Sequence, residues 1–196
     1  MTDLAGREEV EILADKDPGV GLPGRVYLPG YSRTMGPQSH LFAERERLQS
    51  LTWEYFDVKQ LSPTIGAELV GLDLSQELTD EVVSEIQQAL WDYKVIFFRN
   101  QEITSEEQLR FAQRFGELEI HPFLPPNTKT PELVRFEKNA NAAGYENQWH
   151  HDVTWRETPS QGAILRAIEI PPIGGDTLFV DANAAYEGLT PVSYTH

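Results

Sequence analysis

Residues 147–155 read Asn-Gln-Trp-His-His-Asp-Val-Thr-Trp, and within them one residue separates a histidine, His150, from a carboxylate, Asp152. The residues that follow favour a β-strand, in which side chains alternate between the two faces. In such a strand His150 and Asp152 project from one face and His151 from the other. An imidazole and a carboxylate on one face supply two of the three ligands of the 2-His-1-carboxylate triad that binds Fe(II). The stretch therefore predicts a metal site.

Three downstream segments give this short motif a context. Residues 158–163 read Thr-Pro-Ser-Gln-Gly-Ala, residues 174–178 read Gly-Gly-Asp-Thr-Leu, and residues 184–187 read Ala-Ala-Tyr-Glu. In this order and spacing they resemble the taurine dioxygenase / 2,4-D dioxygenase family of Fe(II)- and 2-oxoglutarate-dependent oxygenases, in which a Trp-His-x-Asp-Val-Thr segment comes first. The resemblance extends back to about Leu61 and covers roughly two-thirds of the chain.

The resemblance implies a cofactor, co-substrates and roles for three residues. Fe(II) is the implied metal, with His150 and Asp152 as ligands, and 2-oxoglutarate and O₂ are the co-substrates. Thr177 is expected to donate its hydroxyl to a carboxylate of 2-oxoglutarate. The implied reaction hydroxylates a C–H bond of a small organic acid or a sulfonate/sulfate ester and releases succinate and CO₂. The family's second metal histidine and its 2-oxoglutarate-binding arginine come far C-terminal, so we expect both outside these 196 residues.

Candidate substrate-binding residues come from two parts of the sequence. His121 matches a histidine that contacts the sulfonate in taurine dioxygenase, and Leu124 stands where that enzyme has a tyrosine. Glu146 stands at a substrate-binding asparagine of that enzyme, with Asn147 one place away, and Val153 follows the metal carboxylate. A carboxylate at position 146 repels a sulfonate, so we expect a substrate other than taurine unless the register shifts by one residue and Asn147 takes that place.

Two other functions stay open beside the dioxygenase. A barrel of the same fold could act as a non-catalytic binding module or be an inactive fragment of such an enzyme. A zinc hydrolase using His150, His151 and Asp152 fits poorly, because adjacent residues of a strand face opposite ways. A downstream histidine and arginine in the reading frame would favour the dioxygenase over both.

The expected fold class is α+β, a double-stranded β-helix (a cupin-like jelly roll) with N-terminal helices and an apparent C-terminal truncation. The expected domains are an irregular N-terminal extension over residues 1–55 and the N-terminal part of a dioxygenase domain over 56–196. Strands are predicted over residues 56–59, 65–71, 94–99, 161–170 and 177–180. Helices are predicted over residues 41–51, 79–93, 104–116 and 181–189, those after Thr79 and Thr104 beginning with N-cap residues.

The composition excludes several classes of protein. The net charge is −15 and no segment is basic, which disfavours binding to nucleic acid or to an anionic membrane surface. There is no cysteine, so disulfides and thiolate metal sites are absent. The first residues are acidic where a signal peptide needs an apolar run, and no stretch is apolar enough to span a membrane. We expect a cytoplasmic protein with a small-molecule substrate, and leave open whether it is a homo-oligomer.

Overall fold

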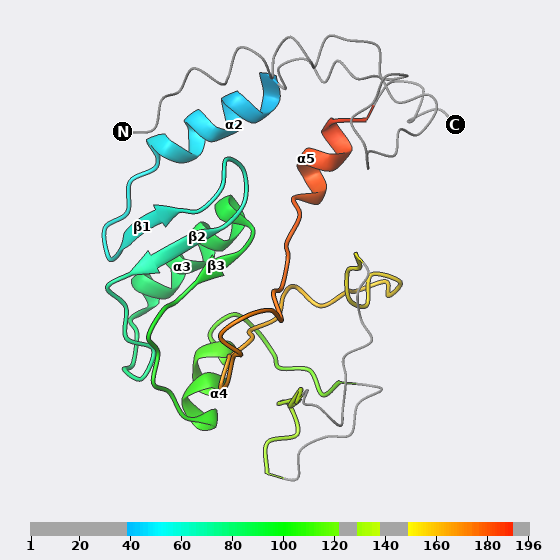
Figure 1. Ribbon diagram of the computed structural model, residues 1–196. Coiled ribbons are helices and arrows are strands. Elements are labelled where there is room, and N and C mark those ends of the chain that lie inside the picture. Colours follow the sequence, from blue (N-terminus) through cyan, green and yellow to red (C-terminus); the bar gives the residue numbers. More distant parts are fainter. Residues whose placement is uncertain (1–38, 122–128, 138–148, 190–196) are drawn as a thin grey trace. The chain divides into compact units, whose positions relative to one another are not determined.

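The computed structural model describes residues 39–121, 129–137 and 149–189 (Figure 1). Its elements, in chain order, are α2 (Ser39–Ser50), β1 (Asp57–Gln60), β2 (Ala67–Val70), α3 (Asp80–Tyr93), β3 (Ile96–Phe97), α4 (Ser105–Gln113) and α5 (Ala182–Glu187). All described strands and three of the four described helices precede residue 114. The α+β class predicted from the sequence is therefore confirmed for the described residues.

The three strands form one mixed sheet in the order β1-β2-β3. β1 pairs with β2 antiparallel, with Asp57 opposite Val70. β2 pairs with β3 parallel, with Ala67 opposite Ile96, and α3 provides the crossover that a parallel pair needs. Gly66 begins this arrangement with φ +87, a conformation that favours glycine, and its amide donates to the Tyr93 carbonyl at 2.8 Å. The short predicted strands at 56–59, 65–71 and 94–99 are thus confirmed, with shifted ends.

Helix α3 forms for the reasons that its sequence suggests. The Thr79 side chain accepts a hydrogen bond from the Val82 amide at 3.5 Å and caps the first turn. The face that carries Ile86 and Ala89 is fully buried, and these residues belong to the same cluster as Ala67 of β2. The complete buried cluster consists of Leu48, Phe56, Ala67, Leu69, Leu74, Ile86, Ala89, Tyr93 and Phe111. The helix therefore covers the sheet and closes one compact core.

Helix α4 begins with the predicted capping box. The Thr104 hydroxyl accepts from the Glu107 amide at 3.2 Å, and the Glu107 carboxylate accepts from the Thr104 amide at 2.6 Å. The helix ends at Gln113, three residues before the predicted end at Gly116. Phe111 is its buried aromatic, and Leu109 and Ala112 are half-buried.

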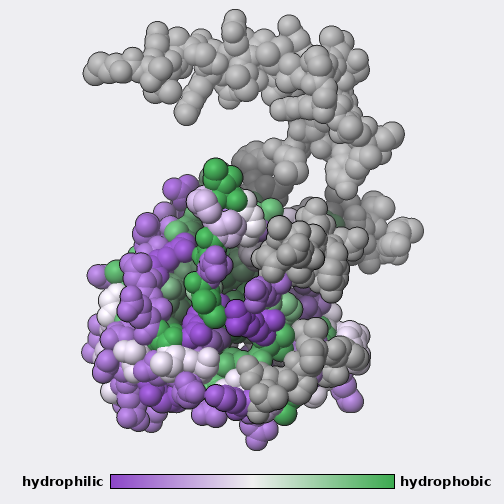
Figure 2. Space-filling model, turned by 60° about the horizontal axis from the view of Figure 1, so that its bottom comes forward, coloured by the Kyte–Doolittle hydropathy of each residue, from purple (hydrophilic) through white to green (hydrophobic). Residues whose placement is uncertain are grey.

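Residues 149–189 contain one regular element, α5, in the described structure. The strands predicted over residues 161–170 and 177–180 are not present, because a strand needs a neighbour for its backbone N–H and C=O groups, and none of β1 to β3 pairs with them. Their apolar side chains are consequently exposed, Leu165 at 73% and Leu178 at 70% among them. On the face in Figure 2 apolar residues interrupt the hydrophilic surface. No described helix is long and apolar enough to cross a membrane.

Candidate functional site

His150 and Asp152 bring a nitrogen and an oxygen to one point. His150 Nε2 lies 3.5 Å from Asp152 Oδ1, and both side chains are largely exposed, at 62% and 84%. Two donors on adjacent positions of a metal, each at a bond length of about 2.1 Å, lie about 3 Å apart. The separation of 3.5 Å is somewhat wider than this, and the pair has the donor chemistry of two metal ligands.

The backbone that carries this pair is a turn and not the predicted strand. Residues 152–155 form turns, and the Arg156 amide donates to the Val153 carbonyl at 3.2 Å. Val153 has φ 47, which is unusual for a β-branched residue and incompatible with a strand. The strand prediction for residues 147–155 is wrong in the described part because no neighbouring strand is available to stabilise an extended backbone. His151 interacts locally, with its Nδ1 3.1 Å from the Asp152 carbonyl oxygen.

The segment that follows α4 lies beside this turn. Glu119 accepts hydrogen bonds from Arg156 and, at 2.8 Å, from the Ser160 hydroxyl. These bonds, the one from Arg156 foremost, hold the pKa of the Glu119 carboxyl below its usual range, and the nearby His121 acts in the same direction. His121 follows Glu119 by two residues in the chain. Glu146 and Asn147, the other candidate substrate residues, lie outside the described residues.

Thr177 lies on an exposed segment after a glycine turn. Gly174 and Gly175 have φ +79 and +73, values that favour glycine, and Thr177 follows two residues later with an exposed side chain. The segment before this turn is tied to α4, because Gln108 Nε2 donates to the Ile164 carbonyl at 3.3 Å. Arg166 likewise donates to the Ile103 carbonyl.

The segment after Thr177 is held by residues that the sequence analysis did not single out. Lys94 Nζ lies 3.3 Å from Asp181 Oδ2, and Asp181 is almost completely buried. Asp181 also caps α5, and an aspartate before a helix-forming run is the signal that could have identified it. Nothing in the sequence indicated its partner, which lies 87 residues earlier (181 − 94).

Within residues 39–121, 129–137 and 149–189, no group of three or more His, Cys, Asp or Glu side chains is arranged to hold a metal. His150 and Asp152 form a pair without a third protein ligand in that part of the chain. A nitrogen and a carboxylate oxygen are nevertheless donors that suit Fe(II). The donor set fits the metal in type, and it would fill two of the three positions of a facial triad.

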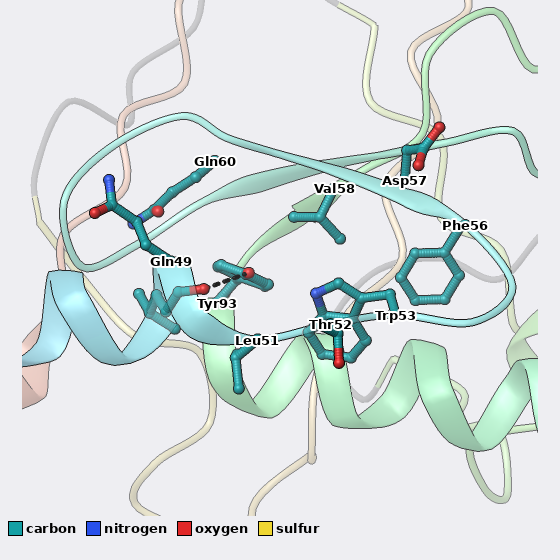
Figure 3. Close-up of a pocket in the computed structure, with 10 residues that line it drawn as sticks. Gln49, Leu51, Thr52, Trp53, Phe56, Asp57, Val58, Gln60 and Tyr93 are labelled. Atoms are coloured by element: carbon teal, nitrogen blue, oxygen red, sulfur yellow. Dashed lines mark hydrogen bonds between the residues drawn. The ribbon is translucent and has the colours of Figure 1, made fainter.

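A separate pocket of about 380 Å³ lies between the end of α2 and β1 (Figure 3). Trp53, Phe56, Val58 and Tyr93 line it, and the Tyr93 hydroxyl donates to the Leu48 carbonyl at 3.3 Å. The Trp53 indole nitrogen is buried there, and no described residue meets the geometric criteria for a hydrogen bond with it. None of the candidate site residues in the described part of the chain lines this pocket.

A family model described as taurine catabolism dioxygenase TauD, TfdA family matches residues 57–192. An alkylsulfatase of Acinetobacter baylyi is 37% identical over 137 residues, which are 69% of this chain and 43% of that protein. An α-ketoglutarate-dependent sulfate ester dioxygenase of Pseudomonas putida is 39% identical over 135 residues, which are 68% of this chain and 44% of that protein. The chain thus spans less than half the length of either relative.

A solved structure of a taurine dioxygenase from Burkholderia xenovorans is 38% identical in sequence and matches 42% of this chain and 32% of its own, with a TM-score of 0.38. Another solved relative, called AAD-2, was crystallised with Mn(II) and N-oxalylglycine and is 35% identical. It matches 34% of this chain and 23% of its own, with a TM-score of 0.33.

Proposed function

Because this chain belongs to the taurine catabolism dioxygenase TauD, TfdA family, we propose that the natural protein is an Fe(II)- and 2-oxoglutarate-dependent dioxygenase. It hydroxylates a C–H bond of a small organic acid or a sulfonate/sulfate ester and releases succinate and CO₂. The observation that carries the proposal is the pair His150 and Asp152, 3.5 Å apart within the Trp-His-His-Asp-Val-Thr motif. The names of the two relatives with 37% and 39% identity support it.

The described residues take three roles in this reaction. His150 and Asp152 hold the metal, and the carboxylate offsets part of its charge. Thr177 donates its hydroxyl to a carboxylate of 2-oxoglutarate. The bound metal supplies the oxidative chemistry, which uses O₂ and the 2-oxo acid. The chain's own residues bind and orient the reactants. Since the described part supplies two metal ligands, a further histidine and an arginine elsewhere in the protein complete the proposed site.

The proposed fold of the natural protein is a double-stranded β-helix, with residues 56–196 forming the N-terminal part of its dioxygenase domain. Residues 161–170 alternate small and branched apolar residues, and residues 177–180 form a short run after the glycine turn. Both segments would pair once neighbouring strands are available. The exposure of Leu165 and Leu178 supports this proposal, because such side chains are normally covered. The boundary predicted between residues 55 and 56 stays a prediction.

The proposed substrate carries an alkyl or aryl group beside an anionic head. His121 would contact the anionic group, and Glu146, Asn147 and Val153 complete the candidate substrate set. Leu124 offers an apolar surface where taurine dioxygenase has a hydroxyl donor, which favours an alkyl portion. We expect turnover of an alkyl sulfate or an aryloxy acid to exceed that of taurine. Equal kcat/KM values for taurine and the best alkyl sulfate would contradict this substrate class.

The metal site is tested by the substitution Asp152→Ala. Removing the anionic ligand should weaken Fe(II) binding by more than about 100-fold, since changes outside the ligand shell alone cost about 10–100-fold. Succinate formation by the natural protein should then fall to background. His151→Ala is the matched control, because it removes a neighbouring imidazole that the proposal leaves off the metal. Wild-type succinate formation by the Asp152 variant would rule out the proposed site.

A non-catalytic binding module remains the second candidate, because the described residues bring two metal donors together and not three. Such a module would bind a small organic acid without consuming 2-oxoglutarate. Oxygen uptake by the natural protein, measured with Fe(II), 2-oxoglutarate and a panel of alkyl sulfates, separates the two functions.

A further inference from the structure

Lys94 adopts a backbone conformation that normally belongs to glycine. It follows the last residue of α3 with φ 67 and ψ −31, and its amide donates to the Leu90 carbonyl at 2.7 Å. The ψ value lies outside the left-handed helical region, and the Val95 amide donates to the Tyr93 carbonyl at 2.7 Å, so Lys94 stands at the centre of a γ-turn. A residue with a side chain is strained at such a positive φ, at a cost in stability. An interaction of the side chain would offset this cost.

The Lys94 ammonium lies among three oxygens from three parts of the chain. It donates to the Thr64 carbonyl at 2.8 Å and to Glu44 Oε1 at 3.2 Å, and lies 3.3 Å from Asp181 Oδ2. Thr64 lies between β1 and β2, and Glu44 belongs to α2. An ammonium has three N–H donors, so these oxygens can satisfy all of them. All hydrogen-bond donors of the Lys94 side chain can therefore have a partner.

Asp181 divides its two carboxylate oxygens between Lys94 and α5. Oδ1 accepts from the amides of Asn183 and Ala184 at 3.0 and 3.1 Å, while Oδ2 faces the ammonium. The Asp181 side chain is only 6% exposed. A carboxylate buried to this degree is strongly destabilising without a cation, so the two residues depend on each other.

A second contact acts beside the ion pair. The ring of Phe179 meets the ring of Phe97, in β3, edge to face with centroids 6.1 Å apart. Lys94 and Phe97 together therefore hold residues 179–181. Thr177 lies two residues before Phe179, and the glycine turn lies immediately upstream of it. Thr177 is therefore only two residues from Phe179, which is held by its contact with Phe97, so the position of its backbone is restricted.

We propose that Lys94 is a positioning residue, which through Asp181 fixes the segment that presents Thr177 to 2-oxoglutarate. The role assigned to Thr177 rests on the proposed function, whereas the contacts of Lys94 and Asp181 are independent of that function. The glycine-like backbone at Lys94 is consistent with this role, because the strain is retained where the ammonium is needed.

Three variants separate positioning from folding. Asp181→Asn keeps a side-chain oxygen that can cap α5 and removes the charge that faces Lys94. Lys94→Met removes the ammonium and keeps the strained backbone. Lys94→Gly removes the ammonium and relieves the strain, so it should melt at a higher temperature than Lys94→Met. Arg114→Met is the control, because it removes a cation that ties α4 to Leu78 and Asp80, away from Asp181.

The first measurement is hydrogen exchange of the 196-residue chain. Amides of residues 183–188 should exchange at least about 10-fold faster in Asp181→Asn and in both Lys94 variants, a loss of about 1.4 kcal/mol in local protection. Amides of α3 should keep their wild-type rates, and Arg114→Met should leave residues 183–188 unchanged. Wild-type exchange of these residues in Lys94→Gly and Asp181→Asn would overturn the proposal.

The second measurement is calorimetric binding of N-oxalylglycine in the presence of Mn(II). The three variants should bind it about 10-fold more weakly than wild type. The double variant Lys94→Met/Asp181→Asn should have an affinity no lower than that of the weaker-binding single variant, because both substitutions remove the same ion pair. Faster amide exchange in the Lys94 variants with an unchanged affinity for N-oxalylglycine would show that Lys94 is only structural and would overturn its positioning role. A wild-type protein that does not bind N-oxalylglycine would contradict the role of Thr177 and the proposed function. The exchange rates would then still decide whether Lys94 holds the segment.

Discussion

At the scale of single residues, Glu44 carries a strongly shifted ionisation. Its carboxylate accepts hydrogen bonds from Arg47 at 2.8 and 3.0 Å and from Lys94 at 3.2 Å. The bond with Arg47 is the main cause that lowers the pKa of Glu44 from 4.5 to about 2, against the opposing effect of burial. The folded state therefore holds this group ionised at pH values where the unfolded chain protonates it.

The stability of the protein should fall in acid in part through Glu44. Because its pKa is lower in the folded state, its contribution is complete above pH 4.5 and is lost as the pH falls from 4.5 towards 2. After allowance for solvent screening, we expect about 1–2 kcal/mol. Urea unfolding at pH 7 and pH 3 measures it, and Glu44→Gln should reduce the pH dependence by that amount. An identical pH dependence in both proteins would exclude this role.

At the scale of elements, the signals that the sequence conveys best are those that act within one turn. Thr104 and Glu107 are three residues apart, so their reciprocal capping was predictable from the four-residue sequence 104–107. The two hydrogen bonds, from the Glu107 amide to the Thr104 hydroxyl at 3.2 Å and from the Thr104 amide to the Glu107 carboxylate at 2.6 Å, confirm it. The turn at residues 152–155 was not predictable in this way. A strand is stable only beside a partner, and an alternating pattern does not reveal whether that partner is available.

The same limit applies to the candidate site. The convergence of His150 and Asp152 was anticipated from their spacing, although the structure achieves it through a turn and not a strand. Lys94 and Asp181 were not anticipated as a pair, since an ion pair between distant residues leaves no periodic signal in the sequence.

The capping box gives a test at this scale. Thr104→Ala removes the hydroxyl that accepts from the Glu107 amide and should lower the free energy of unfolding by about 1 kcal/mol. Ser105→Ala, in the first turn of the same helix, is the control and should change it by less than about 0.5 kcal/mol. Both values come from urea titrations monitored by circular dichroism. Equal losses in the two variants would show that the cap does not stabilise α4.

At the scale of the whole molecule, stability and the candidate chemistry reside in different parts of the sequence. The buried cluster runs from Leu48 to Phe111, whereas His150, Asp152 and Thr177 lie on exposed chain. Substitutions in the buried cluster should therefore lower the stability of the fold, whereas substitutions of His150, Asp152 or Thr177 should abolish function without unfolding the protein.

Ile86 tests this division because it is fully buried at the centre of α3. Ile86→Ala should lower the free energy of unfolding by about 2–5 kcal/mol through lost burial and a residual cavity. Trp91→Ala, on the same helix, is the control, since Trp91 is 59% exposed and its removal should cost less than about 1 kcal/mol. Thermal unfolding of both variants measures the difference. A similar shift in the two would mean that α3 is not packed as described.

The continuity of the core between Leu48 and Phe111 also bears on the order of events during protein synthesis. The ribosome adds about 5–20 residues per second, and 39 residues (150 − 111) separate the end of this cluster from His150. The residues of the sheet and its covering helix are thus synthesised roughly 2–8 s before the metal motif. Asp181 follows Lys94 by 87 residues (181 − 94), so we expect the end of α3 to have formed when Asp181 leaves the ribosome.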